Sequence, residues 1–294
     1  MNLKGYIRRK IRDTCARLDR KKIDAQISSD KSSIPVFWAN QNNFGDRLTH
    51  DILTYYDKFP ILVHPINAAI FGAGSIVQIL KNYPKWTGNF LGSGLIEPRK
   101  ILFKKPTPKW VRGPLTADYI NCPTNSFGDP GLIADTLYLD TANKNIPEFE
   151  VGFIPHYADL QIPWIIELCR NPPKGLIVIN PRQSPKKVAS YINSCERIAS
   201  SSLHGLIFSD SLFKPSIWAT CGGRVIGNDF KFRDYFASIE TKKTRWRVSS
   251  VADLMSISDS AETSNAAAIR ERKTQIFKLL DETINIKEKE SDAE

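Results

Sequence analysis

The feature that most constrains the fold is a repeated order of short apolar run, polar turn and amphipathic segment. In the second half of the chain this order is regular from Glu150 onward. Short apolar runs that alternate with segments of helical spacing are typical of a parallel sheet with helices on its faces. We expect strands at 151–154, 176–179, 197–200 and 216–218, and helices at 158–169, 185–195 and 203–212.

The first half carries the same order less regularly. We expect strands at 34–39, 61–63, 68–71, 89–91, 101–103 and 110–111, with a helix after the first strand. Two of these strands end in Gly-x-Gly, at 72–74 and 92–94, but neither continues to the Gly-x-Gly-x-x-Gly fingerprint of dinucleotide-binding domains. The glycines therefore indicate close backbone approach and do not identify a ligand.

The strand and helix order restarts after a polar stretch at 140–148, which we interpret as a linker. A chain of 294 residues is long enough for two domains of moderate size. The predicted fold class is α/β, with two Rossmann-like domains facing across a cleft. The predicted boundaries are 1–30 for a basic N-terminal helix, 31–148 and 149–260 for the two domains, and 261–294 for a C-terminal helix and tail.

The formal net charge of +10 is concentrated in the first 22 residues. Residues 1–27 have a thin apolar stripe at helical spacing, so this helix either lies on an anionic membrane surface or packs on the protein's own body. No nucleic-acid motif occurs elsewhere, which argues against nucleic acid as a partner. The chain lacks a bilayer-length apolar run and a signal-peptide core, so we expect a cytoplasmic protein, peripheral at the inner membrane face if the first helix binds there.

Metal and disulfide chemistry are not indicated. The five cysteines are scattered and include no Cys-x-x-Cys pair, so neither a disulfide framework nor a zinc site is predicted. The acidic residues form no evident cluster for a divalent cation. We therefore expect a protein without a metal or other bound cofactor.

The serine run Ser200-Ser201-Ser202 ends one expected strand and precedes a helix that begins with Leu203 and His204. In open α/β sheets, ligands bind beyond the carboxyl ends of the strands, where helix N-termini present free N–H groups. Hydroxyl and N–H groups at this place suit a phosphate or carboxylate. The helix dipole disfavours a charged His204, which suits a general base. The alternative is ordinary helix capping beside a structural histidine.

Polar residues follow other strands as well. Arg182 and His156 should reach the same edge as His204, although on position alone Arg182 is equally compatible with a solvated side chain. In the first half, Asn43 and Asp46 follow the first strand, where Asp46 could accept hydrogen bonds from a sugar or act as an acid or base, and where capping is again the alternative. Arg112 precedes a helix start and is placed to reach the cleft.

Six short motifs occur in a fixed order along residues 40–239. They are Asn43-Phe44-Gly45-Asp46, Gly72-Ala73-Gly74-Ser75, Val111-Arg112-Gly113-Pro114, Gly128-Asp129-Pro130-Gly131-Leu132, Ile154-Pro155-His156-Tyr157 and Ser201-Ser202-Leu203-His204-Gly205, and Phe230–Ile239 extends the match. This set resembles the polysaccharide pyruvyltransferase family. The resemblance is most specific at the Ser-Leu-His-Gly and Gly-Asp-Pro-Gly-Leu segments.

The resemblance implies a fold similar to GT-B glycosyltransferases, with the acceptor in the first domain and phosphoenolpyruvate, the donor, in the second. The product would be a cyclic pyruvate ketal on a sugar of a bacterial surface polysaccharide or of its lipid-linked precursor. By resemblance, the donor residues are Arg182, Ser202, Leu203 and His204, with His156 and Asn43 nearby and Asp46 across the cleft. Some members have an arginine where this chain has Ser202, so a second basic ligand is expected elsewhere, with Arg112 as the candidate.

The expected chemistry needs an acid to protonate the methylene carbon of the donor and a base to take a hydroxyl proton. His204 and Asp46 are the candidates, with their order left open, and Arg182 would hold the anion and stabilise the departing phosphate. No metal is expected to take part.

Two other functions fit the fold pattern. A GT-B glycosyltransferase that uses a nucleotide sugar would favour an acidic residue late in the second domain, where Cys221-Gly222-Gly223-Arg224 has none. A non-catalytic anion- or sugar-binding protein would tolerate the loss of His204. The acceptor sugar, its reacting hydroxyls, the ketal stereochemistry and the oligomeric state stay open.

Overall fold

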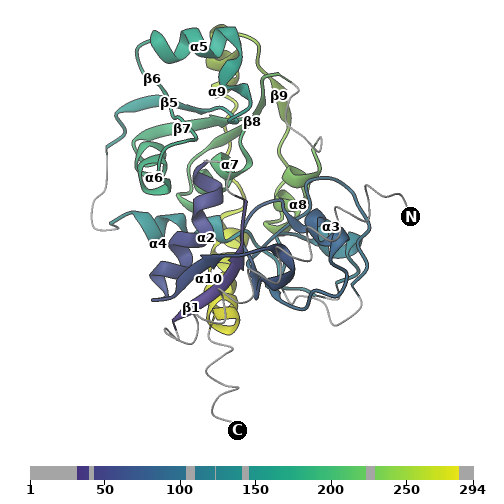
Figure 1. The fold of residues 1–294 in the computed structure, drawn as a ribbon. Coiled ribbons are helices and arrows are strands. Elements are labelled where there is room, and N and C mark those ends of the chain that lie inside the picture. The colour runs from purple at the N-terminus through teal and green to yellow at the C-terminus, as the bar shows by residue number, and fades with distance from the viewer. Residues whose placement is uncertain are drawn as a thin grey trace.

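The computed structural model describes residues 32–39, 43–103, 110–122, 124–140, 146–222 and 229–284. Within these ranges the chain forms two parallel sheets with helices packed on them (Figure 1). The predicted α/β class is therefore confirmed. The predicted basic helix at 1–27 and residues 141–145 of the predicted linker lie outside the described residues.

The first sheet has the strand order β2-β1-β3-β4. Val36 lies at its centre, paired with Leu62 on one side and Ile70 on the other. The strands are β1 (Ser33–Phe37), β2 (Phe59–Leu62), β3 (Ile70–Phe71) and β4 (Asn89–Phe90), and the helices of this half are α2 (Phe44–Tyr55), α3 (Pro114–Tyr119) and α4 (Ala134–Tyr138), with 3₁₀ turns η1 (Pro65–Asn67), η2 (Val77–Asn82) and η3 (Pro130–Ile133). The first four predicted strands are confirmed to within a few residues.

The strands predicted at 101–103 and 110–111 were wrong. Val111 forms only an isolated bridge with Phe127, and the Trp110 indole donates a hydrogen bond to the carbonyl of Gly128. Trp110 and Val111 are buried in different apolar clusters. These apolar residues therefore fill the core from a loop and do not extend the sheet.

The second sheet has the strand order β6-β5-β7-β8-β9. Its strands are β5 (Phe149–Ile154), β6 (Leu176–Val178), β7 (Cys195–Ser200), β8 (Ser216–Thr220) and β9 (Arg245–Arg247), and its helices are α5 (Pro163–Arg170), α6 (Pro185–Asn193), α7 (Leu203–Ser211), α8 (Phe230–Ser238), α9 (Val251–Ser258) and α10 (Ala266–Ile284), with the 3₁₀ turn η4 (Asp159–Gln161). The helix predicted from residue 158 begins only at Pro163, because a proline disfavours helical geometry at the preceding residue, and Ile162 is extended. The sequence did not indicate β9, whose three residues are all exposed.

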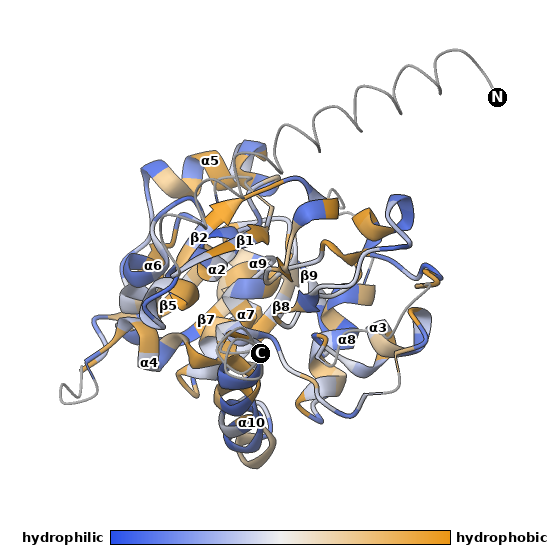
Figure 2. Cartoon of the chain, turned by 60° about the horizontal axis from the view of Figure 1, so that its bottom comes forward, coloured by the Kyte–Doolittle hydropathy of each residue, from blue (hydrophilic) through white to orange (hydrophobic). Residues whose placement is uncertain are grey.

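One apolar cluster joins the two halves. It combines Phe44 and Leu48 of α2 with Ile154 of β5 and Leu206 of α7, and Ile276 of α10 belongs to it as well. A separate cluster packs α5 and α9 on the opposite face of the second sheet (Figure 1). Apolar residues are concentrated in the interior strands, whereas the outer turns of α10 are hydrophilic (Figure 2). Because one cluster contains residues of α2, β5, α7 and α10, the two halves share a core.

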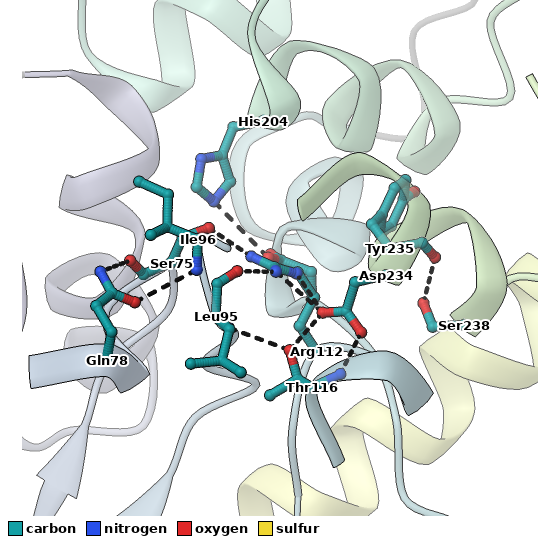
Figure 3. Close-up of polar contacts among 11 residues, drawn as sticks. Ser75, Gln78, Leu95, Ile96, Arg112, Thr116, His204, Asp234, Tyr235 and Ser238 are labelled. Atoms are coloured by element: carbon teal, nitrogen blue, oxygen red, sulfur yellow. Dashed lines mark hydrogen bonds and ion pairs between the residues drawn. The ribbon is translucent and has the colours of Figure 1, made fainter. Parts of the chain in front are cut away.

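A buried ion pair connects α8 to the first half. The Nε of Arg112 donates to Asp234 of α8 at 2.9 Å, and both side chains are fully buried. The same carboxylate accepts from the backbone N–H of Thr116 at 2.9 Å and from its hydroxyl at 2.7 Å (Figure 3). Arg112 also donates to Ser75 Oγ and to the carbonyl of Leu95, each at 2.6 Å. Helix α8 thus packs against α3 of the first half, although in the sequence it lies between β8 and β9 of the second sheet.

The substitution Arg112→Met should lower the free energy of unfolding by about 3–5 kcal/mol, because it leaves the buried Asp234 carboxylate without its counter-charge. Urea denaturation measures this loss. Arg99→Met is the matched control, since Arg99 pairs with Glu97 at the surface with both side chains about 40% exposed, and it should cost about 1 kcal/mol or less. Equal losses in the two variants would contradict a structural role for the buried pair.

Candidate active site

The strand order reverses next to β1 in the first sheet and next to β5 in the second. At such a switch point the loops beyond the carboxyl ends of the two central strands diverge and leave a crevice for a ligand. The two crevices form one cavity of about 640 Å³. Its lining includes Asn43 and Asp46 after β1, Gly74 and Ser75 after β3, His156 after β5, Ser202, Leu203 and His204 after β7, and Lys231 of α8.

Asn43 and Asp46 contact each other at the start of α2. The Asn43 side chain caps the helix by accepting from the Asp46 backbone N–H at 3.2 Å, and its amide donates to the Asp46 carboxylate at 2.7 Å. Asn43 therefore caps the N-terminus of α2, as the alternative interpretation of these two residues predicted. The same two side chains also line the cavity.

The serine run divides between structure and cavity. Ser200 and Ser201 are fully buried. The Ser200 hydroxyl donates a hydrogen bond to the carbonyl of Ile154 at 3.0 Å. The Ser201 hydroxyl donates to Asp159 and accepts from the backbone N–H of His156, and both of these distances are 2.7 Å. Of the three hydroxyl residues, only Ser202 lines the cavity. Its side chain caps none of the described N–H groups of α7, so the start of this helix faces the cavity uncapped by its own serine.

Both histidines of the second half are held neutral. Burial lowers the pKa of His204 below its usual value, Asp129 opposes this shift, and Arg112 and Lys231 add to it. Burial, helped by Lys231, lowers the pKa of His156 to about 3. His156 Nδ1 accepts from the backbone N–H of Ala158 at 3.3 Å, so its remaining proton lies on Nε2. At neutral pH both rings are therefore uncharged.

Lys231 was not singled out by the sequence, although it is a cation in the cavity lining. The residue is only 7% exposed, and its ammonium lies 5.4 Å from the centroid of the Phe232 ring. Burial lowers its pKa to about 8, the positive charge of Arg112 adds to the shift, and Asp159 opposes it. The sequence feature that could have indicated a buried Lys231 is a polar stripe at helical spacing between aromatic residues, formed by Lys231, Asp234 and Ser238.

His64 is a second lining residue that the sequence did not single out. It follows β2, and the Tyr83 hydroxyl lies 3.2 Å from its Nε2. With His156 and His204, it makes three of the chain's four histidines members of this lining.

Two predicted arginines do not line the cavity. Arg182 is exposed beyond β6, and its neighbour Pro181 lines the cavity instead, with its carbonyl accepting the backbone N–H of Phe44 at 2.9 Å. Arg112 is fully buried and reaches the lining only through Ser75 (Figure 3). The expectation that Arg112 enters the cleft is corrected, because Asp234 and the Leu95 carbonyl occupy its guanidinium. A donor role for Arg182 stays a prediction.

Gly45 lets the two halves approach at His204. A Cβ added at Gly45 would lie 2.0 Å from Nδ1 of His204 and 2.5 Å from its Cγ. Phe44 packs edge-on against the same ring at 6.1 Å between centroids. Glycine in a helix costs about 0.5–1 kcal/mol relative to alanine, so the close contact explains the glycine.

Residues 16–222 match the sequence profile of the polysaccharide pyruvyl transferase family. This chain belongs to that family. The matched range covers β1 to the end of β8 and all the lining residues named above except Lys231. The family is therefore the one that the six motifs indicated.

Individual relatives add little about function. An uncharacterised protein of Acanthamoeba polyphaga mimivirus is 28% identical over 163 residues, a match that covers 53% of this chain and only 56% of that protein. A functionally uncharacterised protein of Klebsiella pneumoniae has a solved structure that matches with 15% identity and a TM-score of 0.38, over 74% of this chain and 93% of that one. In the described ranges no helix is long and apolar enough to cross a membrane, and no group of three or more metal-ligating side chains occurs.

We expect Gly45→Ala to lower the free energy of unfolding by about 1–3 kcal/mol, as overpacking does, although alanine is the better helix former. Thermal or urea denaturation measures the change. The control is the double variant Gly45→Ala/His204→Ala, in which the missing imidazole leaves room for the methyl group. The alanine should cost nothing in that background, and an equal loss in both backgrounds would contradict the contact.

Proposed function

We propose that this protein transfers the pyruvyl group of phosphoenolpyruvate onto two hydroxyls of one sugar, with release of phosphate and formation of a cyclic ketal. The acceptor would be a surface polysaccharide or its lipid-linked precursor. The observation that carries the proposal is that a buried lysine, two neutral histidines and a helix N-terminus from the second half share one cavity with the Asp46 carboxylate of the first. Family membership supports the reaction class.

The second half has the groups that an anionic donor needs. Phosphoenolpyruvate carries a carboxylate and a phosphate, and the Lys231 ammonium lies in the lining beside Ser202 and the uncapped start of α7. Free N–H groups at a helix N-terminus and a poorly solvated ammonium both bind such anions. Lys231 thus fills the role for which Arg112 was the expected candidate. His156, with its proton on Nε2, is a further donor in the same lining.

The proton transfers require one acid and one base. The methylene carbon of the donor takes a proton from the acid while a sugar hydroxyl adds to C2 and gives its proton to the base. Phosphate leaves with the electrons of its C2–O bond, and the second hydroxyl then adds to C2 and loses its proton. His204 and Asp46 enter the cavity from opposite halves and are the candidates. A neutral His204 starts as an acceptor, which favours it as the base.

Three parts of the proposal rest on the sequence alone. We keep the GT-B-like domain arrangement, with the acceptor on the first half and the donor on the second. We also propose a cytoplasmic location, with residues 1–27 either on the membrane surface or packed on the protein's own body, and a reaction that needs no metal.

Incubation with phosphoenolpyruvate and a panel of synthetic or lipid-linked glycosides should release phosphate and raise the acceptor mass by 70 Da, the mass of C₃H₂O₂. Phosphate assay and mass spectrometry measure the two products, and added EDTA tests the metal independence. His204→Ala should lower the rate of both by about 10²–10⁴-fold. Transfer from nucleotide sugars in place of phosphoenolpyruvate would instead identify a glycosyltransferase.

Donor binding should weaken as pH rises through about 8. An ammonium with its pKa near that value is charged below it and neutral above it, so kcat/KM for phosphoenolpyruvate should fall over this range. Lys231→Met should lower kcat/KM by about 10–100-fold at pH 7 and remove this dependence. Lys231→Arg keeps the charge and should move the fall to higher pH. Lys187→Met, on the outer surface of α6, is the matched control, and an equal effect there would contradict the assignment.

A further inference from the structure

Asp129 is a buried carboxylate with one oxygen unused. The residue is fully buried, and its Oδ1 caps η3 by accepting the backbone N–H of Gly131 at 2.9 Å. Within the described chain its Oδ2 has no hydrogen-bond partner. A cap needs only one oxygen, and asparagine caps as well as aspartate. Because an unpaired buried charge costs several kcal/mol, the negative charge needs another explanation.

The unused oxygen faces His204. The Nε2 of His204 lies 3.8 Å from Asp129 Oδ2, and it is likewise buried without a hydrogen-bond partner among the described residues. Two complementary polar atoms without partners thus point at each other across a gap one ångström longer than a hydrogen bond. Such contacts in ligand-free sites tighten when the reactants bind.

The positions of Asp129 and His204 are both fixed by neighbouring residues. Gly128 has a positive φ of 140°, its carbonyl accepts the Trp110 indole N–H at 2.9 Å, and Pro130 follows Asp129, so the carboxylate stands on a fixed turn. The His204 ring packs against Gly45 on the side of Nδ1. The ring therefore presents Nε2 to the buried carboxylate and Nδ1 to the junction with the first half, near the Asp46 side of the cavity.

We propose that Asp129 is a positioning residue that fixes neutral His204 with its proton on Nε2, so that Nδ1 is the nitrogen that exchanges a proton with the reactants. A carboxylate accepting from one imidazole nitrogen sets the tautomer and leaves the lone pair on the other. The other groups around His204 are the cations Arg112 and Lys231, the neutral His156 and the Asp46 carboxylate; none of the described ones hydrogen-bonds Nε2. The tautomer assignment stands independently, and only the role of Nδ1 rests on the proposed function.

Nitrogen-15 NMR of histidine-labelled protein tests the assignment without any substrate. The chain has only four histidines, so the His204 signals are identified by their loss in His204→Ala. Wild-type His204 should be in the Nε2–H form at pH 8. Asp129→Asn keeps the Oδ1 cap but turns an amide N–H toward Nε2, so the ring should change to the Nδ1–H form. Its pKa should also fall further, because a nearby negative charge is gone.

Asp210→Asn is the matched control, because Asp210 is also a buried carboxylate, on α7 itself, but accepts hydrogen bonds from Tyr235 and Ser264 instead of facing a histidine. It should leave the His204 tautomer unchanged. An Nδ1–H form in the wild type would overturn the proposal even if Asp129→Asn did not fold, and so would the same tautomer in wild type and Asp129→Asn.

Turnover provides the second measurement. Asp129→Asn should lower kcat by about 10²–10⁴-fold with less than about a threefold change in KM for phosphoenolpyruvate. Asp129→Asn/His204→Ala should be no slower than His204→Ala alone, since Asp129 acts through the ring. A full additional loss in the double variant would contradict the positioning role. If no substrate is turned over by the wild type, the proposed function fails while the NMR result still decides the tautomer.

Discussion

The buried ion pair between Arg112 and Asp234 is the interaction on which the geometry of the site depends. It brings α8, which lies between β8 and β9 in the sequence, against the first half of the chain. Lys231 lies three residues before Asp234 on the same side of α8, so the pair also fixes where that ammonium enters the cavity. Through Ser75, Arg112 supports the opposite wall as well.

The cavity combines positive charge with uncharged histidines, and one arrangement produces both. Arg112 and Lys231 lie close enough to each other and to His204 for their charges to lower the pKa of its ring. The same charges favour an anion in the cavity. Asp129 acts in the opposite direction on His204, from the side away from the cavity. The attraction of an anion and the protonation of His204 are therefore set by the same few buried charges.

The rule that ligands bind beyond the carboxyl ends of parallel strands could be applied to the sequence, because it needs only the order of strands and turns. It correctly brought His156 and Ser202 to the cavity from one half and Asp46 from the other. It did not separate Arg182 from its neighbour: the loop beyond β6 brings Pro181 into the lining, whereas the Arg182 side chain is exposed. The order of strands and turns does not decide which side chain of a loop turns inward.

Long-range pairing accounts for the other differences between sequence and structure. Arg112 and Asp234 are 122 residues apart, and nothing in either segment identifies the other as its partner. Because the sequence does not show this pairing, Arg112 was interpreted as a cation available to a ligand at the start of a helix. Lys231 resembled an ordinary surface residue for the same reason, since its burial follows from the packing of α8 on α3.

The apolar cluster shared by the two halves has a consequence for motion. A hinge that swung the halves apart would expose Phe44, Leu48 and Leu206 to water, at about 25 cal/mol for each Å² uncovered. It would also separate Gly45 from the His204 ring. Wide opening is therefore disfavoured, and substrates should reach the cavity through movements of its bordering loops. If the acceptor is the proposed glycan, it would present one terminal or side-branch residue while the rest of the polymer stays in solvent.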